Sequence, residues 1–365
     1  MFRPFHVILD LTSRCNLQCV MCYFAATDRL NFPPFDSGPA DGNMPLPVFE
    51  EIASELFPRA WRVALSCAAE PMIHPRFREI LDVAGRYGVP DLWFPTNLLA
   101  LTEANAKAIL DARVRTVAAS IDGTTKETYE KIRVPAKWER LLSALELLRE
   151  TRRARGGDRP RLRIIFTWMK SNRRELAELP AFAQRWGARE LDVRYVSPTV
   201  GVDVSSELLN GEDPRELNAE LAGAAREAVA RGLRLASFPD FEAAEDLPRT
   251  FGRRLSRRLW RLRAGIDKPE HIRYMTRKSL YGCAYPDRYF VIRPNGAVAP
   301  CIYWDREPLG IYPADGLAAI RAGAPLARIR KGLRSGEPVG TCASCGERRT
   351  ALYRLRGSGE RVIEP

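Results

Sequence analysis

From residue 5 to about residue 237, the pattern of apolar and polar positions alternates between one typical of strands and one typical of helices. Short apolar runs predict strands, and amphipathic stretches with helical spacing lie between most of them. The predicted strands are residues 5–11, 62–66, 92–96, 116–121, 161–168, 191–196 and 233–238. The clearest predicted helices are residues 47–56, 104–112, 138–153 and 173–186. This alternation predicts an α/β fold in which helices cover a parallel sheet.

The rest of the chain departs from this pattern. Residues 31–45 are rich in Pro, Gly and Asp and predict a loop. Residues 239–280 are first acidic and then basic, and residues 281–346 look like a second unit with its own cysteines. We therefore expect three segments: a core over 1–238, a linker or basic helical insertion over 239–280, and a cysteine-rich domain over 281–365.

Composition narrows the class of protein. The chain has 365 residues, 45% of them apolar, so it is long enough to bury a substantial core. No apolar run is long enough to span a membrane, and no signal peptide is visible at the start. The eight cysteines therefore point to metal sites in a cytoplasmic protein rather than to disulfides.

The net charge of +12 is concentrated in one place. Residues 250–280 contain ten Lys or Arg and two Asp or Glu, a local charge of +8. Apolar residues recur there at helical spacing, which predicts a packed helix with a solvated basic face. A lid over an anionic substrate and a membrane-surface helix are also compatible with this stretch. Nucleic acid is not an expected partner, because no recognised binding motif is present.

Three cysteines follow the first predicted strand. Cys15, Cys19 and Cys22 have the spacing C-x3-C-x2-C in the run Leu11 to Tyr23. Three thiolates on one loop can hold three irons of a [4Fe–4S] cluster and leave the fourth iron open to a small molecule. Zinc is the alternative, although its sites usually contain paired C-x2-C units.

This arrangement resembles the radical S-adenosylmethionine (SAM) superfamily. The resemblance covers residues 5 to about 240 and implies a partial (β/α)6 barrel. It also implies that SAM binds the open iron and is cleaved to a 5′-deoxyadenosyl radical. Met21 departs from the family, which often has an aromatic residue before the third cysteine.

Further segments match the family at predicted strand ends. The run 67–71, Cys-Ala-Ala-Glu-Pro, looks like the GGEP segment, so the resemblance implies that Glu70 binds the SAM amino group. In the same way, Thr96 and Asn97 resemble a Thr-Asn-Gly segment, and Ser120 and Asp122 resemble residues near the SAM ribose and carboxylate. Arg133 and Asn172 are weaker candidates for SAM binding. Three aromatic residues could line the adenine or substrate pocket, but we expect each of them to pack in the core instead: Phe166, Trp168 and Tyr195.

A second cysteine set lies near the C-terminus. Cys283, Cys301, Cys342 and Cys345 have the spacing C-x17-C-x40-C-x2-C. Asn295-Gly296 lies between two apolar runs and predicts a hairpin that brings the first two cysteines together. Four thiolates suit either zinc or a fully ligated [4Fe–4S] cluster.

Behind a radical SAM core, this block resembles the SPASM/twitch extension that holds an auxiliary [4Fe–4S] cluster. No cysteine follows Cys345, so the one-cluster twitch form is the closer match. The spacing is similar to that of the butirosin-pathway aminocyclitol dehydrogenase. The resemblance thus implies two [4Fe–4S] clusters, SAM, and a flavodoxin- or ferredoxin-type reductant.

With four protein ligands, the auxiliary cluster suits electron transfer. We therefore expect oxidation of a small polar metabolite, such as a sugar, aminocyclitol or nucleoside, which could be anionic. Cys67 is the eighth cysteine. It is either a packing residue or a hydrogen-atom donor in a redox-neutral epimerase. Decarboxylation, dehydration and ribosomal-peptide maturation would also suit such a chain, and so would a zinc-bearing binding protein with an inactive barrel.

Overall fold

The computed structural model describes residues 5–22, 41–196, 202–237, 283, 285–304 and 306–344. Expectations for the basic stretch 250–280, for most of the loop 31–45 and for Cys345 lie outside the described residues.

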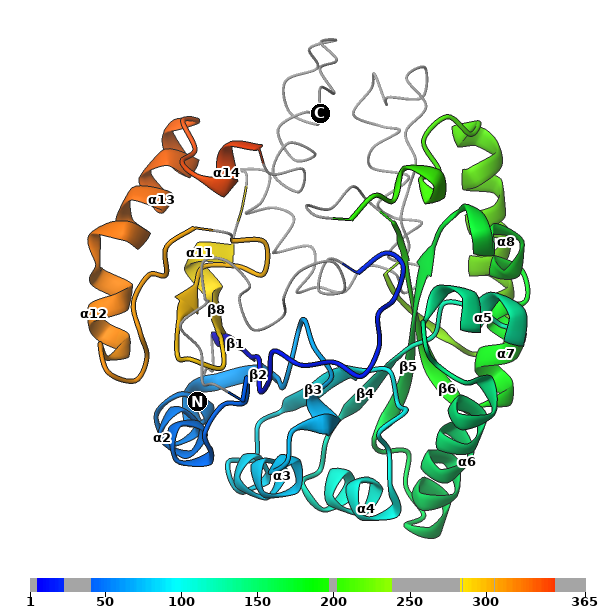
Figure 1. Ribbon diagram of the computed structural model, residues 1–365, viewed down its shortest axis with the longest axis horizontal. Coiled ribbons are helices and arrows are strands. Elements are labelled where there is room, and N and C mark those ends of the chain that lie inside the picture. Colours follow the sequence, from blue (N-terminus) through cyan, green and yellow to red (C-terminus); the bar gives the residue numbers. More distant parts are fainter. Residues whose placement is uncertain are drawn as a thin grey trace.

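A single nine-stranded sheet organises the described chain, with the order β7-β6-β5-β4-β3-β2-β1-β8-β9. In Figure 1 the strands follow an arc, and the helices lie outside it. All neighbouring pairs are parallel except β8 and β9, which form an antiparallel hairpin. The strands are β1 Phe5–Leu9, β2 Ala60–Ala64, β3 Asp91–Thr96, β4 Thr116–Ser120, β5 Arg161–Trp168, β6 Ala188–Tyr195, β7 Arg234–Ser237, β8 Tyr289–Ile292 and β9 Val298–Ala299. The predicted α/β partial barrel is therefore confirmed.

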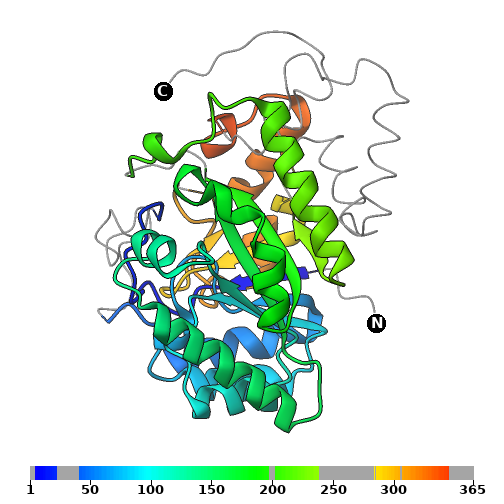
Figure 2. The same ribbon diagram turned by 90° about the vertical axis from the view of Figure 1, so that its right-hand side faces the viewer.

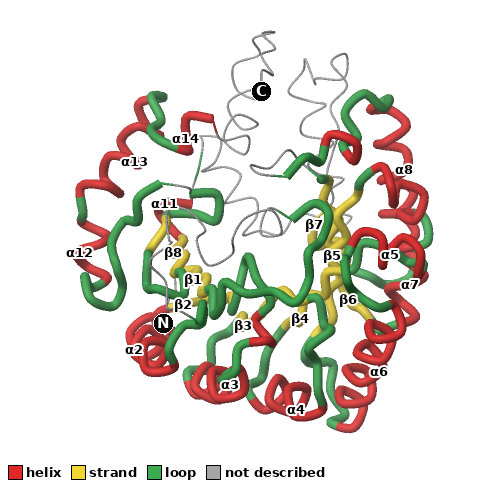
Figure 3. The backbone as a smooth tube through the Cα atoms, viewed as in Figure 1, coloured by secondary structure: helices red, strands yellow, loops and turns green. Residues whose placement is uncertain are grey.

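Helices alternate with the strands and cover one face of the sheet (Figure 3). Thr102, Thr125 and Asp213 cap α4, α5 and α8 by accepting a backbone N–H bond, which stabilises these helix starts. The helices are α2 Leu46–Leu56, α3 Phe77–Arg86, α4 Glu103–Asp111, α5 Lys126–Ile132, α6 Trp138–Ala154, α7 Leu179–Arg185, α8 Pro214–Ala230, α11 Tyr285–Arg288, α12 Leu317–Ala322, α13 Ala324–Ser335 and α14 Thr341–Ser344. Four short 3-10 helices are η1 Phe57–Arg59, η2 Pro71–Ile73, η3 Lys170–Leu176 and η4 Ser205–Glu207.

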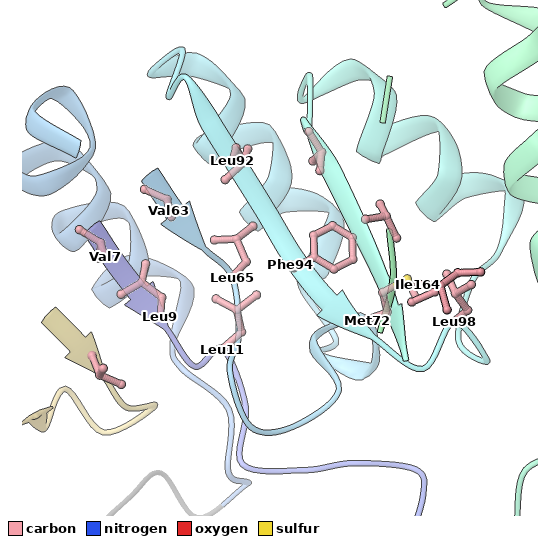
Figure 4. Close-up of a cluster of buried hydrophobic side chains, with 14 of the residues drawn as sticks. Val7, Leu9, Leu11, Val63, Leu65, Met72, Leu92, Phe94, Leu98 and Ile164 are labelled. Carbon is pink, nitrogen blue, oxygen red and sulfur yellow. The ribbon is translucent and has the colours of Figure 1, made fainter. Parts of the chain in front are cut away.

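The main core lies between the sheet and these helices. Side chains alternate along a strand, so Val7 and Leu9 share one face of β1 and pack with residues of β2 and β3 (Figure 4). Phe94 on β3 meets Phe77 on α3 with ring centroids 5.6 Å apart, which identifies this face as the helix-covered one. We call the opposite face the inner face, because the arc of strands curves around it. Figure 2 shows the helices on the outside from a second direction.

The predicted helix over 173–186 is divided in the structure. The 3-10 helix η3 ends at Leu176, and α7 begins at Leu179 with Pro180 in its first turn. Proline lacks an N–H, and its ring clashes with the carbonyl four residues earlier, so a continuous helix cannot pass through Pro180.

The C-terminal hairpin joins the core sheet directly. β8 pairs in parallel with β1, with Val7 opposite Phe290 and Leu9 opposite Ile292. The backbone N–H of Asp10 continues this ladder to the carbonyl of Ile292, at 2.9 Å. The sequence predicted the hairpin, but not its position beside the first strand, because that position depends on a contact between segments that are far apart in the chain.

In the part of the chain that the structure describes, no helix has the length and apolar content needed to cross a bilayer.

Candidate active site

The first three cysteines lie on the loop that leaves the carboxyl end of β1. Cys19 is buried, whereas Cys15 and Cys22 are half-buried. Several N–H groups point at their sulfurs: Leu17 N lies 3.4 Å from Cys15 Sγ, and Asn97 Nδ2 lies 3.9 Å from it. Such donors stabilise thiolates bound to iron, so this loop fits an iron–sulfur cluster.

The three thiols of this loop interact through their charges. Among the described residues, no group of three His, Cys, Asp or Glu converges as ligands of a single ion. Cys15 and Cys22 nevertheless lie close enough to Cys19 to raise its pKa by their charge. Burial is the main cause that raises the pKa of Cys19, to about 11, and Arg133 acts against it. Each thiolate of a [4Fe–4S] cluster binds a different iron, so three thiolates on one loop can hold three irons.

Glu70 connects the loops after β2 and β3. Its carboxylate is 2% exposed and accepts bonds from Met72 N at 3.1 Å, Thr96 Oγ1 at 2.8 Å and Asn97 N at 2.7 Å. Burial raises the pKa of Glu70 to about 7, and these three bonds oppose the shift. A carboxylate offers about four acceptor positions, so one remains for a ligand.

Asn97 joins this network to the cysteine loop. Its Nδ2 lies 2.7 Å from Asn16 Oδ1 as well as near Cys15 Sγ. The structure therefore brings Glu70, Thr96 and Asn97 together beside the first cysteine set. Their binding of SAM stays a prediction.

Asp122, Arg133 and Asn172 form a second group next to the same loop. Arg133 Nη2 lies 2.7 Å from Asp122 Oδ2, and Arg133 Nη1 lies 3.8 Å from Cys19 Sγ. Asn172 Nδ2 donates to the carbonyls of Asp122 at 3.0 Å and Thr167 at 2.9 Å, which gives it a positioning role for this group. Ser120 is half-buried at the end of β4.

The candidate aromatic residues separate into two kinds. Phe166 and Trp168 are buried in the core on the helix-covered face of β5, as core packing requires. Tyr195, at the end of β6, is 49% exposed.

Cys67 belongs to a buried polar group that the sequence did not reveal. Its Sγ lies 3.4 Å from Asp10 Oδ2 and 3.7 Å from Arg293 Nη1, and Arg293 also pairs with Asp10. Burial raises the pKa of Cys67 well above its usual range, and the Asp10 carboxylate adds to this shift. The thiol is therefore held in its protonated form. The one available clue was a charged residue at the end of each apolar strand run, Asp10 and Arg293.

The inner face of the barrel carries further charges. Arg163 Nη2 pairs with Glu190 Oε2 at 2.5 Å, and Arg62 and Arg163 lie over the ring of Trp93 at 4.7 and 5.7 Å. These side chains sit opposite the apolar residues of the same strands. Sequence alternation predicted two faces, but not which charged residues pair across neighbouring strands on the second one.

One charged pair lies near the carboxyl end of β6. Arg194 donates to Asp192 through Nε at 3.0 Å and Nη2 at 2.8 Å, and Asp192 raises its pKa. The phenols of Tyr303 and Tyr285, from the C-terminal segment, also act on this guanidinium. The Arg194 side chain is 55% exposed, so it is available to a ligand.

The C-terminal cysteines lie at the other end of the β1–β8 pair. Cys283 precedes β8 and Cys301 follows β9, and because the two strands are antiparallel, both lie toward the amino end of β8. Cys342 is on α14, and Cys345 lies outside the described residues. Three half-buried thiols around one hairpin have the donor chemistry for a second cluster.

Comparison with protein families decides the assignment. The radical SAM superfamily matches residues 9–156, and the SPASM iron–sulfur cluster-binding domain matches residues 283–346. The chain therefore contains a radical SAM domain and a SPASM domain. Its radical SAM domain binds SAM and a [4Fe–4S] cluster, and its SPASM domain binds additional iron–sulfur clusters.

Individual relatives are distant. The AdoMet-dependent heme synthase of Methanosarcina barkeri is 28% identical over 219 residues, which cover 59% of this chain and 57% of that protein. The match thus spans a little over half the length of this curated relative. SuiB of Streptococcus suis with bound S-adenosylmethionine shares the fold at a TM-score of 0.66 and 15% identity, over 95% of this chain and 72% of SuiB. BtrN in complex with AdoMet and 2-DOIA gives a TM-score of 0.45 and 13% identity, over 92% and 89% of the two chains.

Proposed function

We propose that the protein is a radical SAM oxidoreductase that oxidises a C–H bond of a small polar metabolite held inside the barrel. A sugar, an aminocyclitol or a nucleoside is the expected substrate class. In this proposal Cys15, Cys19 and Cys22 would hold the cluster at which SAM supplies the hydrogen-abstracting radical. The C-terminal cysteines would hold the auxiliary cluster, which would accept the remaining electron, and the accompanying proton of the substrate would pass to solvent. A flavodoxin- or ferredoxin-type protein would supply the electron that starts the reaction.

The position of the two cysteine sets carries this proposal. Cys15, Cys19 and Cys22 follow the carboxyl end of β1, whereas Cys283 and Cys301 flank the amino end of the adjacent β8. β1 has five residues and β8 has four, so the two ends of this strand pair are roughly 15 Å apart. A substrate on the inner face would therefore lie between a radical source and an electron acceptor.

The lining of the inner face supports a polar substrate. Asp192 and Arg194 form a pair with fixed orientation, and the half-exposed guanidinium can donate further hydrogen bonds. Glu190 and Arg163 add a second buried pair. Polar groups placed in this way orient a ligand, and they would be costly to leave against an apolar one.

A redox-neutral epimerase is the second candidate, because of Cys67. Its thiol stays protonated beside Asp10 and Arg293, and a protonated thiol is the form that can return a hydrogen atom. Decarboxylation, dehydration and peptide maturation are further outcomes of the same radical chemistry.

Product analysis separates these candidates. Anaerobically reconstituted protein would be incubated with SAM, a one-electron donor and a panel of sugars, aminocyclitols and nucleosides. Oxidation predicts a product two hydrogens lighter and one 5′-deoxyadenosine per product, with Cys67→Ala still active. If Cys67→Ala makes 5′-deoxyadenosine but no product, and the wild-type product gains carbon-bound deuterium from D2O, the enzyme is an epimerase.

A further inference from the structure

Arg133 connects the first cysteine set to a buried carboxylate. It is the residue that ends α5, and it is 7% exposed. Its Nη1 lies 3.8 Å from Cys19 Sγ, while its Nη2 lies 2.7 Å from Asp122 Oδ2. One guanidinium thus contacts both a cluster cysteine and the carboxylate that follows β4.

This geometry is fixed from both sides. Asp122 is fully buried, and its Oδ1 accepts a bond from Thr167 N at 2.6 Å. Its carbonyl accepts a bond from Asn172, at 3.0 Å. Gly123, the next residue, permits this packing, because a Cβ there would come within 2.6 Å of Tyr129 N on α5.

The cysteine loop is tied to the same helix end by its backbone. Val20 N donates to the carbonyl of Ile132 at 3.0 Å, and Ile132 is the neighbour of Arg133. The loop residue that carries this bond adjoins Cys19. The contact between Arg133 and Cys19 therefore follows from main-chain bonds, and not only from a side-chain rotamer.

We infer that Arg133 is a positioning residue that raises the reduction potential of the SAM-binding cluster through Cys19, and that Asp122 moderates this effect. Reduction adds one negative charge to a cluster whose Cys19 ligand is buried, where charge is costly. An N–H donor and a cation at the ligand sulfur stabilise that added charge. The neighbouring Asp122 carboxylate opposes it.

The inference differs from the predicted role of Arg133 in binding SAM. That role requires SAM, whereas an effect on the potential is present without it. It also does not depend on which substrate is oxidised. It rests only on the assignment of Cys19 as a cluster ligand.

The test is a redox titration of the full-length reconstituted protein without SAM, followed by EPR. A parallel sample with SAM identifies the signal of the cluster that SAM perturbs. Arg133→Gln should lower the potential of that cluster, and Asp122→Asn should raise it. We expect at least a tenfold change in the ratio of reduced to oxidised cluster at a fixed potential, which is 59 mV for a one-electron couple. Arg133→Lys should lie between Arg133→Gln and the wild type, because it keeps the charge.

Arg155→Gln is the matched control, because Arg155 also pairs with a carboxylate, Asp111, but on the surface. It should leave both potentials unchanged. A loss of packing alone would not shift Arg133→Gln and Asp122→Asn in opposite directions. An unchanged potential in iron-replete Arg133→Gln overturns the inference. If Arg133→Gln fails to retain iron, an unchanged or lowered potential in Asp122→Asn overturns it instead.

Discussion

Arg293 pairs with Asp10 inside the protein, although 283 residues separate them in the chain. Arg293 follows β8 and Asp10 follows β1, and both are almost fully buried. The pair closes the end of the β1–β8 ladder and faces Cys67. It therefore links the C-terminal hairpin to the core at the point where the first cysteine loop begins.

Removing one member of this pair should destabilise the whole protein. Arg293→Met leaves the Asp10 carboxylate buried without its main cation, a loss that typically costs about 3–5 kcal/mol. Chemical denaturation of the full-length chain would measure it. The double variant Asp10→Asn/Arg293→Met should recover part of the loss, because no buried charge is left behind.

Arg189 and Asp158 provide the control for that measurement. Their pair is exposed, with Arg189 Nη2 2.9 Å from Asp158 Oδ1. We expect Arg189→Met to cost about 1 kcal/mol or less. Equal losses for Arg189→Met and Arg293→Met would show that the buried pair has no special role.

The hairpin turn gives a second prediction. Gly296 has φ +82°, and a Cβ there would collide with the carbonyl oxygen of Tyr312. Gly296→Ala should therefore combine the cost of a left-handed residue, about 1–2 kcal/mol, with overpacking of about 1–3 kcal/mol. Gly336 has the same φ but open space around its Cβ position, so Gly336→Ala isolates the first cost. Unfolding experiments should show the larger loss for Gly296→Ala, and similar losses would contradict the collision.

Local signals in the sequence located most elements. The predicted strand over 161–168 has the same bounds as β5, and the Asn295-Gly296 turn lies where the sequence placed the hairpin. These predictions depend on side-chain alternation and on turn chemistry, both of which involve only near neighbours. The break in the predicted helix before Pro180 could also have been predicted, because proline is tolerated in the first turn of a helix but not in its interior.

Contacts between distant segments could not be predicted in this way. Nothing local in Asp10 or Arg293 indicates their pairing, and the charges of Arg163 and Glu190 fit an exposed strand equally well. The resemblance predicts SAM-binding roles for Glu70, Thr96 and Asn97, and the geometry adds that the Glu70 carboxylate already accepts bonds from three protein donors. The burial of Glu70 depends on the whole fold, and this burial raises the pKa of its carboxyl group.

The pKa of Glu70 leads to a pH-dependent stability. Its pKa is raised by burial from 4.5 to about 7, so the folded protein holds a proton that the unfolded chain releases between these values. Stability from Glu70 is therefore present at low pH and lost as pH rises toward 7. The difference in unfolding free energy between wild type and Glu70→Gln should fall by up to about 3 kcal/mol between pH 5 and pH 8. A constant difference, measured by urea denaturation without SAM, would show that the three hydrogen bonds keep the pKa of Glu70 near its ordinary value.

The cysteine assignments lead to a prediction about iron content. With both sets occupied by [4Fe–4S] clusters, the reconstituted chain should hold roughly eight irons. Replacing Cys15, Cys19 and Cys22 together with Ala should remove roughly half of the iron and all SAM cleavage. Cys67→Ala is the matched control, because Cys67 contacts Asp10 and Arg293, and it should retain the iron and the cleavage. Iron analysis and a visible spectrum measure the cluster content, and a 5′-deoxyadenosine assay measures SAM cleavage. If the triple variant still forms 5′-deoxyadenosine, the ligands of the SAM-binding cluster lie elsewhere, whereas zinc in the wild type would favour a binding protein with an inactive barrel.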